Sequence, residues 1–400
     1  MTGNEKSSAK KMAAIGAFAV ASVMFSSHAG GGFATGNQAN QYYVSTGIVG
    51  IVSVVLAMAL LGLTIREAII MKTTRNLKTH KEVFEVLYHP FGWLEILFEV
   101  YFNIMLICAA GAVVAGASKL VTETIGLSNM VTVVLIGIVL LVFSIFGVQL
   151  VAKASTVMAV GILITLFIIY FAGIGAKLNE IKIIISNPIT SLDIKKGFIN
   201  AFVYAGFQCV FVPTMIACGR PLETKKKITC AMVIAFVMNT LTLCLSVLML
   251  LGWKVDFTAA GQTTLPVLYI CKQLDIKVLN ALYQIALLLC LISSGVNLVY
   301  GFITRFSSLK IVEKIEKPIN RRIVTGAVAI IFSSILSLAG LDRIVKFGYG
   351  YCGYLGIFII VIPFLTIGYY RNRKYIKENM TGNDNINTVD LNFSGYPADI

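Results

Sequence analysis

Charged residues are scarce in this 400-residue chain: they make up 13% of it, and only 19 residues are acidic. Hydrophobic residues make up 57%, and the mean hydropathy is +0.84. An ordinary soluble domain has about a quarter of its residues charged. The composition therefore excludes such a domain and predicts an integral membrane protein.

Paired cysteines and catalytic motifs are also lacking. The eight cysteines stand singly, without a CxxC pair, and seven lie in or at the end of apolar runs, where cysteine usually acts as a small hydrophobic residue. The chain has no phosphate-binding glycine loop followed by Lys, no HExxH, and no nucleophile with His and Asp neighbours. We therefore expect no cofactor, no structural metal, no ATP-driven transport and no enzyme.

Ten apolar runs have the length of about 20 residues that a helix needs to cross a bilayer. They form two halves of five, residues 12–176 and 198–370, joined by residues 177–197 and flanked by tails at 1–11 and 371–400. We expect the second tail to be disordered, because its end is polar and rich in Asn. Since five is odd, the halves must lie in opposite orientations, which predicts an inverted repeat. The runs are 12–34, 46–71, 91–118, 129–152, 155–176, 198–218, 228–252, 278–304, 323–340 and 347–370.

The 33 Lys and Arg residues give a net charge of +14, which alone could indicate a nucleic-acid or anionic-lipid partner. Their positions distinguish between these interpretations: 23 of the 33 basic residues lie on one side of the ten spans, the side that also holds both termini. The positive-inside rule then places both termini in the cytoplasm and the 177–197 connection outside. We expect a multi-pass protein of the cell membrane, with the bilayer and not nucleic acid as its partner. The oligomeric state stays open.

The first run contains three consecutive glycines, Gly30, Gly31 and Gly32, next to His28. Each glycine costs about 1 kcal/mol relative to alanine in a helix, so a continuous helix is disfavoured here. An unwound segment in hydrocarbon must be buried in protein or line a cavity, where its free backbone groups can bind polar solutes. Close helix packing is the alternative, but the polar flanking residues favour a break. His28 could couple protons or serve as a hydrogen-bonded packing residue.

The sixth run carries Tyr204, Gly206 and Gln208, followed by Pro213. Proline lacks the amide hydrogen and clashes with the preceding helical turn, so this run should be interrupted or kinked. It opens the second half as the glycine run opens the first, which favours a common role for the two breaks.

The third span contains two acidic residues, Glu95 and Glu99. With Asn103 they recur every four positions. This spacing predicts one polar stripe that faces the bundle interior. Glu95 is near the end of the span and should be solvated. Glu99 is deeper and either makes a structural hydrogen bond or serves as an ion or proton site.

The eighth run carries a pair of hydroxyl residues, and the tenth run carries small residues at four-residue spacing. Ser293 and Ser294 form a hydroxyl pair in the middle of the eighth, where two oxygens could contribute to a cage for a small cation. Gly348, Cys352 and Gly356 in the tenth predict close helix packing.

Residues 31–38, GGFATGNQ, are similar to the GAGFASGQE signature of the YkvI-like amino acid permeases, and residues 293–300, SSGVNLVY, are similar to the eighth helix of that family. Over residues 12–370 the chain resembles the amino acid, polyamine and organocation superfamily. Its LeuT-type fold has two inverted five-helix repeats whose first helices are broken. Asn37 and Gln38 stand where the signature has Gln and Glu, so its acidic group is absent.

The resemblance implies an amino acid site near the membrane midplane and a sodium site beside it. It also implies an outer lid at residues 253–277 and a cytoplasmic counterpart at 72–90. The substrate residues it implies are Gly30, Gly31, Gly32, Phe33, Asn103, Tyr204 and Gln208. The cation residues it implies are Ser26, Ala29, Ser293 and Ser294.

We therefore expect a secondary active transporter that symports an amino acid or similar small organic solute with Na⁺ or H⁺ by alternating access. His28 and Glu99 are the candidates for proton coupling. The alternative is a non-transporting receptor that keeps the ligand pocket, as the permease-like subunits of spore germinant receptors do. The substrate and the coupling ion stay open.

Overall fold

The computed structural model describes residues 3–28, 31–146, 148–219, 221–307 and 309–379. Every regular element in these residues is a helix, which confirms the predicted all-α class. The long helices are α1 (Gly3–His28), α4 (Val49–Thr74), α6 (Glu95–Ile125), α7 (Asn129–Phe146), α8 (Val148–Ala176), α10 (Ser191–Gln208), α12 (Lys225–Ala259), α14 (Lys277–Phe306) and α16 (Pro318–Ser337).

Shorter helices connect these or interrupt them. They are α2 (Gly31–Ala34), α3 (Asn37–Tyr42), η1 (Val44–Thr46), α5 (His80–Tyr88), η2 (Gly92–Leu94), α9 (Leu178–Ser186), η3 (Cys209–Phe211), α11 (Val212–Cys218), α13 (Pro266–Gln273) and α15 (Lys310–Glu313). The last span is a chain of short pieces, of which the η pieces are π-helical. These pieces are α17 (Leu341–Arg343), η4 (Ile344–Tyr349), α18 (Gly350–Gly356), η5 (Ile357–Val361), η6 (Phe364–Gly368) and α19 (Tyr369–Asn379).

Within the described ranges, eight helical segments are long and apolar enough to cross a membrane. A ninth is added if Val160–Ala176 and Leu178–Ser186, which meet at a bend of 74°, count as one span. All ten predicted runs are largely helical, but the count of ten is not confirmed. The first run is the one without such a segment: α1 is not among the candidate spans, and it ends at His28, before the end of the predicted run.

Several boundaries differ from the prediction. α7 ends at Phe146 and α8 begins at Val148, so the loop expected around Lys153 lies within a helix. The 177–197 connection contains α9 and the first turns of α10. α1 begins within the predicted tail 1–11, and α19 continues the last helix to Asn379. Residues 380–400, the rest of the tail predicted to be disordered, lie outside the described residues.

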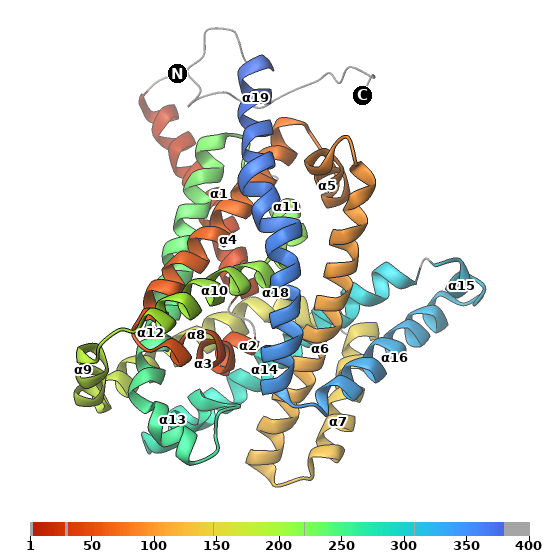
Figure 1. Cartoon of the computed structure of the whole chain (residues 1–400). Coiled ribbons are helices and arrows are strands. Elements are labelled where there is room, and N and C mark those ends of the chain that lie inside the picture. The colour runs from red at the N-terminus through yellow and green to blue at the C-terminus, as the bar shows by residue number, and fades with distance from the viewer. Residues whose placement is uncertain (1–2, 29–30, 147, 220, 308, 380–400) are drawn as a thin grey trace.

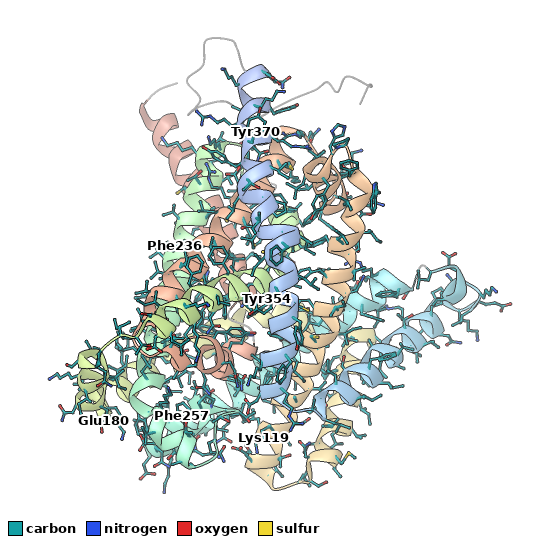
Figure 2. The ribbon with its side chains drawn as sticks, in the orientation of Figure 1. Lys119, Glu180, Phe236, Phe257, Tyr354 and Tyr370 are labelled. Atoms are coloured by element: carbon teal, nitrogen blue, oxygen red, sulfur yellow. The ribbon has the colours of Figure 1, made fainter. Side chains whose placement is uncertain are left out.

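The helices form two groups that pack against each other. α6, α7, α14 and α16 pack mutually, while α4 contacts α10, α11 and α12, and α1 lies against α12. α8 bridges the groups through α12 and α14. Figure 1 shows α5, α19 and the start of α1 at one end of the molecule, with α9 and α13 at the other. These are called the α5 end and the α13 end below; Figure 2 shows Tyr370 at the first, and Lys119 and Glu180 at the second.

α10 crosses the last span at a contact made by glycines. A β-carbon on Gly206 would collide with the backbone of Gly353, and one on Gly356 would collide with the backbone of Gly206. Cys352, between Gly348 and Gly356, is buried, and Gly348 lies against Cys108 of α6. The glycine and cysteine stripe of the last run is therefore a packing surface, which holds α18 directly against the interrupted helix α10.

Candidate functional site

The helix of the first span, α1, has His28 as its last described residue. α1 ends at this residue, and beyond Ala29 and Gly30, which lie outside the described residues, the chain continues as α2 and α3. Gly36 between these helices has a φ of +78°, in the left-handed region that glycine adopts without strain. A β-carbon on Gly36 would also meet Val267 of α13. The chain after Gly31 is therefore divided into short helices, and the turn between α2 and α3 depends on Gly36.

The sixth span is interrupted as well. α10 ends at Gln208, the 3₁₀ turn η3 follows, and Pro213 stands in the first turn of α11. Proline is accepted at the start of a helix because the first amides have no partner there in any case. The proline therefore marks the start of the second piece, as the sequence predicts.

Tyrosines from the other helix group cap the carbonyls at these interruptions. The Tyr101 hydroxyl of α6 lies 2.7 Å from the oxygen of Gly206 and 2.8 Å from that of Phe207. The Tyr283 hydroxyl of α14 donates to the oxygen of Ala34, at the end of α2, over 2.8 Å. Because a buried carbonyl without a partner costs free energy, these hydroxyls stabilise the two interrupted segments.

Five buried polar side chains meet where the two interruptions lie: His28, Gln38, Tyr204, Gln208 and Asn239, here called the His28 cluster. His28 Nδ1 lies 2.7 Å from Asn239 Oδ1, and His28 Nε2 lies 2.7 Å from the Tyr204 hydroxyl. That hydroxyl is 3.1 Å from Gln38 Oε1, and Gln208 Nε2 is 3.5 Å from the same oxygen. The exposed fraction is 6% for Gln38 and at most 3% for the other four. α1, α3, α10 and α12 are thus joined by one polar network.

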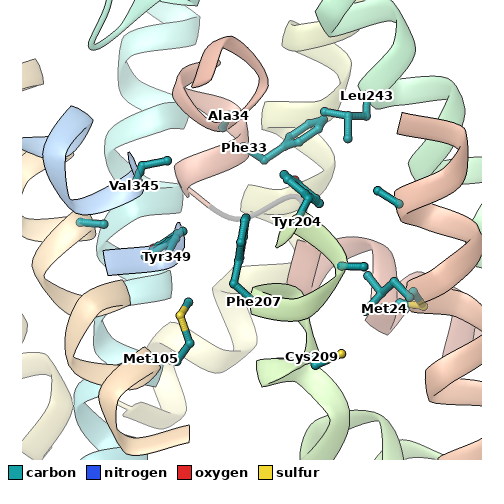
Figure 3. Packing of buried hydrophobic residues seen from close by; sticks show 14 of the residues in the cluster. Met24, Phe33, Ala34, Met105, Tyr204, Phe207, Cys209, Leu243, Val345 and Tyr349 are labelled. Carbon is teal, nitrogen blue, oxygen red and sulfur yellow. The ribbon is translucent and has the colours of Figure 1, made fainter. Parts of the chain in front are cut away.

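Aromatic rings enclose this network. The Phe33 ring of α2 is 5.4 Å from the His28 ring, and the Phe207 ring is 4.8 Å from the Tyr204 ring. Figure 3 shows Phe33 of α2 near Tyr204 and Phe207 of α10 in the core. Tyr43 adds a ring 5.0 Å from Tyr204. The site therefore combines neutral hydrogen-bonding groups with aromatic surface.

Most of the predicted substrate residues meet at this place. The residues that contact members of the His28 cluster, or belong to it, are Gly32, Phe33, Tyr204 and Gln208. Gly31 is the first residue of α2, and Gly30 lies outside the described residues.

Asn103 is not brought to the cluster. Its side-chain nitrogen donates to the backbone oxygen of Glu99, one turn earlier in α6, over 2.8 Å. No hydrogen bond found among the described residues joins Asn103 to His28 or its neighbours. The α6 side chain that reaches the interruption is Tyr101, because two residues along a helix turn the side chain away by more than half a circle.

The predicted cation residues lie on two elements. Ser293 of α14 is buried, Ser294 is half-buried, and α14 packs against α2, directly after the first interruption. The Ser26 hydroxyl is exposed and donates to the backbone oxygen of Val23, while Ala29 lies outside the described residues. The sodium site stays a prediction.

Glu99 forms an ion pair near the α5 end. Arg305 of α14 lies 2.5 Å from Glu99 Oε2, and His80 of α5 lies 3.1 Å from Oε1. The sequence assigned no role to His80, yet it joins this group. Glu95, expected to be solvated, is buried and pairs with Lys81 over 3.3 Å. The polar stripe of α6 therefore faces α5 and α14.

Glu67 is a buried carboxylate that the sequence reasoning missed. It lies in α4 with 3% exposure, pairs with Arg66, and accepts a hydrogen bond from Asn372 of α19 over 2.9 Å. Arg75 donates to the oxygen of the same Asn372 side chain over 2.9 Å. The signal is available in the sequence, because Glu67 stands within the predicted run 46–71, beside Arg66 near the end of that run.

No protein-family model and no curated protein matches the chain. Among solved structures, a manganese transporter from Eremococcus coleocola is 15% identical, with a TM-score of 0.46, over 94% of this chain and 89% of that one. The inward-facing conformation of Mhp1 is 11% identical, with a TM-score of 0.49, over 90% of this chain and 94% of that one. At these scores the function of the chain has to be argued from its own residues.

A second polar group lies at the α13 end. Asn37 of α3 donates to Asp342 Oδ1 of α17 over 2.5 Å and to the backbone oxygen of Thr264 over 3.1 Å. The hydroxyls of Thr263 and Thr264 donate to Asp342 Oδ2 over 3.2 and 2.9 Å. The predicted outer lid, which includes both threonines and α13, is therefore tied to α3 and to the start of the last span.

Proposed function

We propose that this chain is a secondary active transporter of a small organic solute, an amino acid or a molecule of similar size and polarity. The observation that carries the proposal is the His28 cluster: five buried polar side chains placed where two apolar segments both cease to be helical. Interrupted helices inside a membrane protein are tolerated where they line a binding site, because the freed groups there can exchange protein partners for solute.

The chemistry of the cluster suits a solute without net charge. Three amides, one imidazole and one phenol offer both donors and acceptors, and no Asp, Glu, Lys or Arg belongs to the cluster. A zwitterion such as an amino acid satisfies both kinds of group, and the surrounding rings would pack against its apolar part.

Polar contacts at both ends of the bundle support alternating access. Asn37 and Asp342 join elements at the α13 end, and Glu99 and Arg305 join elements at the α5 end. Passage of a solute to either side requires one of these contacts to open. An ion drives this cycle if it binds the two states with different affinity. The coupling ion is part of the proposal as either Na⁺ at Ser293 and its partners or H⁺ at His28.

Proteoliposome counterflow with a panel of radiolabelled amino acids, with and without Na⁺ and at two pH values, tests the proposal. We expect flux of at least one solute, and a loss of roughly tenfold or more in Gln208→Ala, which removes a buried hydrogen-bonding group. Tyr351→Phe is the matched control, because this α18 tyrosine is 67% exposed. Solute binding without flux under every gradient would show the non-transporting receptor instead.

A further inference from the structure

We propose that proton binding to His28 redirects the Tyr204 hydroxyl from His28 to Gln38, and that Asn239 is the positioning residue that makes this switch possible. The inference rests on the proposed function and deepens it, because it identifies how one residue of the same site would couple a proton to movement of α3.

Asn239 fixes which nitrogen of His28 carries the proton in the neutral state. The Asn239 side-chain nitrogen donates to the backbone oxygen of Ala235, 2.7 Å away in the same helix, so its oxygen must face His28. An amide oxygen only accepts, and His28 Nδ1 must therefore carry the hydrogen. The neutral ring is left with Nε2 as an acceptor, directed at Tyr204.

The Tyr204 hydroxyl has one hydrogen and two acceptors within reach, at 2.7 Å for His28 Nε2 and 3.1 Å for Gln38 Oε1. When His28 is neutral, the hydroxyl donates to Nε2. When a proton from water binds Nε2, this nitrogen becomes a donor to the phenol oxygen, and the hydroxyl hydrogen turns to Gln38. Tyrosine keeps its own proton throughout, so only its orientation changes.

The switch acts on α3 because Gln38 belongs to the first turn of that helix. In the neutral state its oxygen has the Gln208 amide at 3.5 Å, a weak contact. In the protonated state it gains the Tyr204 hydroxyl, which is anchored in α10. Proton binding therefore adds a hydrogen bond between α3 and α10, and proton release removes that hydrogen bond.

Few other groups can compete for this proton. Phe33 of α2, Tyr204 of α10 and Asn239 of α12 face the His28 ring, and Tyr204 is the one of these three that ionises. On the elements packed against α1, the titratable groups are Cys218 of α11 and, in α12, Cys230, Cys244, Lys225, Lys226, Lys227, Lys254 and Asp256. The charged members stand at the two ends of α12, about 20 Å from Asn239.

Nitrogen NMR of ¹⁵N-histidine in nanodiscs tests the tautomer directly. The chain has three histidines, and His80→Gln and His89→Gln assign the remaining signals to His28. We expect a neutral ring protonated at Nδ1 and uptake of the second proton at Nε2 as the pH is lowered from about 9 to about 4. A neutral ring protonated at Nε2, or a ring that never titrates in this range, overturns the proposal.

Amide hydrogen exchange of α3, corrected for the intrinsic pH dependence, tests the switch. We expect protection of Asn37–Tyr42 to be about fivefold higher with His28 protonated, the value of roughly one hydrogen bond. Tyr204→Phe and Gln38→Met must each abolish this pH response. If either variant keeps it, the proposal is wrong.

The positioning role of Asn239 has its own readout. In Asn239→Ala the neutral ring can carry its hydrogen on Nε2, so Tyr204 donates to Gln38 at every pH and the response of α3 is lost although His28 remains. Asn239→Asp keeps the acceptor and should keep the tautomer, while its carboxylate favours the protonated ring, so the pH response of α3 should remain and move to higher pH. None of these measurements needs a solute, so a chain that transports nothing can still show the switch, and a transporter whose α3 ignores pH overturns this inference alone.

Discussion

Gly32 shows how a residue without a side chain can control a binding site. A β-carbon at this position would lie 2.5 Å from Nε2 of Gln38, so an alanine has to displace the amide that completes the His28 cluster. The obstacle is the end of a flexible side chain, which can rotate away at little cost. The consequence of the change therefore falls on the site and not on the fold.

We predict that Gly32→Ala weakens solute binding by about tenfold, since it displaces one hydrogen-bonding partner. The melting temperature should change little, because alanine is favoured over glycine in the short helix α2. Binding in proteoliposomes and thermal unfolding in detergent measure the two effects. Gly161→Ala is the control, as a β-carbon on Gly161 meets open space. Equal binding by the two variants would contradict the role of Gly32.

The sequence predicts those residues of the candidate site that lie next to a helix-breaking glycine or proline. It does not reveal the others. His28, Tyr204 and Gln208 stand beside the glycine run or the proline, so local sequence reveals them. Asn239 lies in an apolar run, and its importance depends on α12 packing against α1, 211 positions away. A single amide within an apolar run was the available signal. Tyr101 gave none, because a tyrosine in a span is ordinary until its hydroxyl is seen to cap a carbonyl.

At the scale of elements, the last span departs from the α-helix three times, at η4, η5 and η6. A π-helical turn contains an extra residue and leaves a carbonyl without its usual partner. The Tyr42 hydroxyl of α3 donates to the oxygen of Val345 in η4 over 2.8 Å, and the Tyr88 hydroxyl of α5 donates to that of Ile359 in η5. A short helix at each end of the molecule thus holds the last span at a π-helical turn.

We predict that Tyr42→Phe and Tyr88→Phe each lower the free energy of unfolding by about 1 kcal/mol, because each leaves a buried carbonyl unpaired. Burial raises the pKa of the Tyr88 hydroxyl, so it remains a donor throughout the accessible pH range. Thermal unfolding in detergent is the measurement. The exposed Tyr351, changed to Phe, serves as the control. If all three variants unfold alike, the hydroxyls do not stabilise the π-helical turns.

The helical segments were predictable because a bilayer demands apolar runs of a fixed length. Their interior irregularities were predictable only where glycine or proline dictates them. In η4 and η5 a hydroxyl from α3 or α5 meets a carbonyl of the π-helical turn, and the local sequence of the last span does not reveal such a distant partner. The loop predicted around Lys153 was misplaced for a related reason: the basic residue interrupts the apolar pattern there, yet it lies within α8.

At the scale of the whole molecule, two contacts made by carboxylates lie at opposite ends, with the His28 cluster between them. At the α13 end, Asp342 accepts hydrogen bonds from Asn37 and from the lid threonines. At the α5 end, Glu99 binds Arg305 and His80. Each contact joins a residue before the 177–197 connection to a residue after it. Their roles can be separated by matched substitutions that remove a charge and keep the shape.

We predict opposite responses to Asp342→Asn and Glu99→Gln. Each change weakens charge-assisted hydrogen bonds, so amide exchange should rise about tenfold in the helix next to the altered contact, α13 for the first and α5 for the second. Exchange of Pro266–Gln273 and His80–Tyr88, measured in nanodiscs, reports on the two ends. Glu313→Gln, at an exposed residue of α15, is the control for loss of a carboxylate.

The response of the distant end decides whether the contacts are gates. If the protein alternates between two states, opening one end stabilises the other, and exchange of α5 must fall in Asp342→Asn while exchange of α13 falls in Glu99→Gln. If the contacts are merely local fastenings, the distant helix keeps its wild-type exchange in both variants. Reciprocal protection would show that the two ends are coupled through the elements between them, the His28 cluster and the α10–α18 crossing. If exchange rises only in the helix next to each altered contact, these two contacts do not control alternating access.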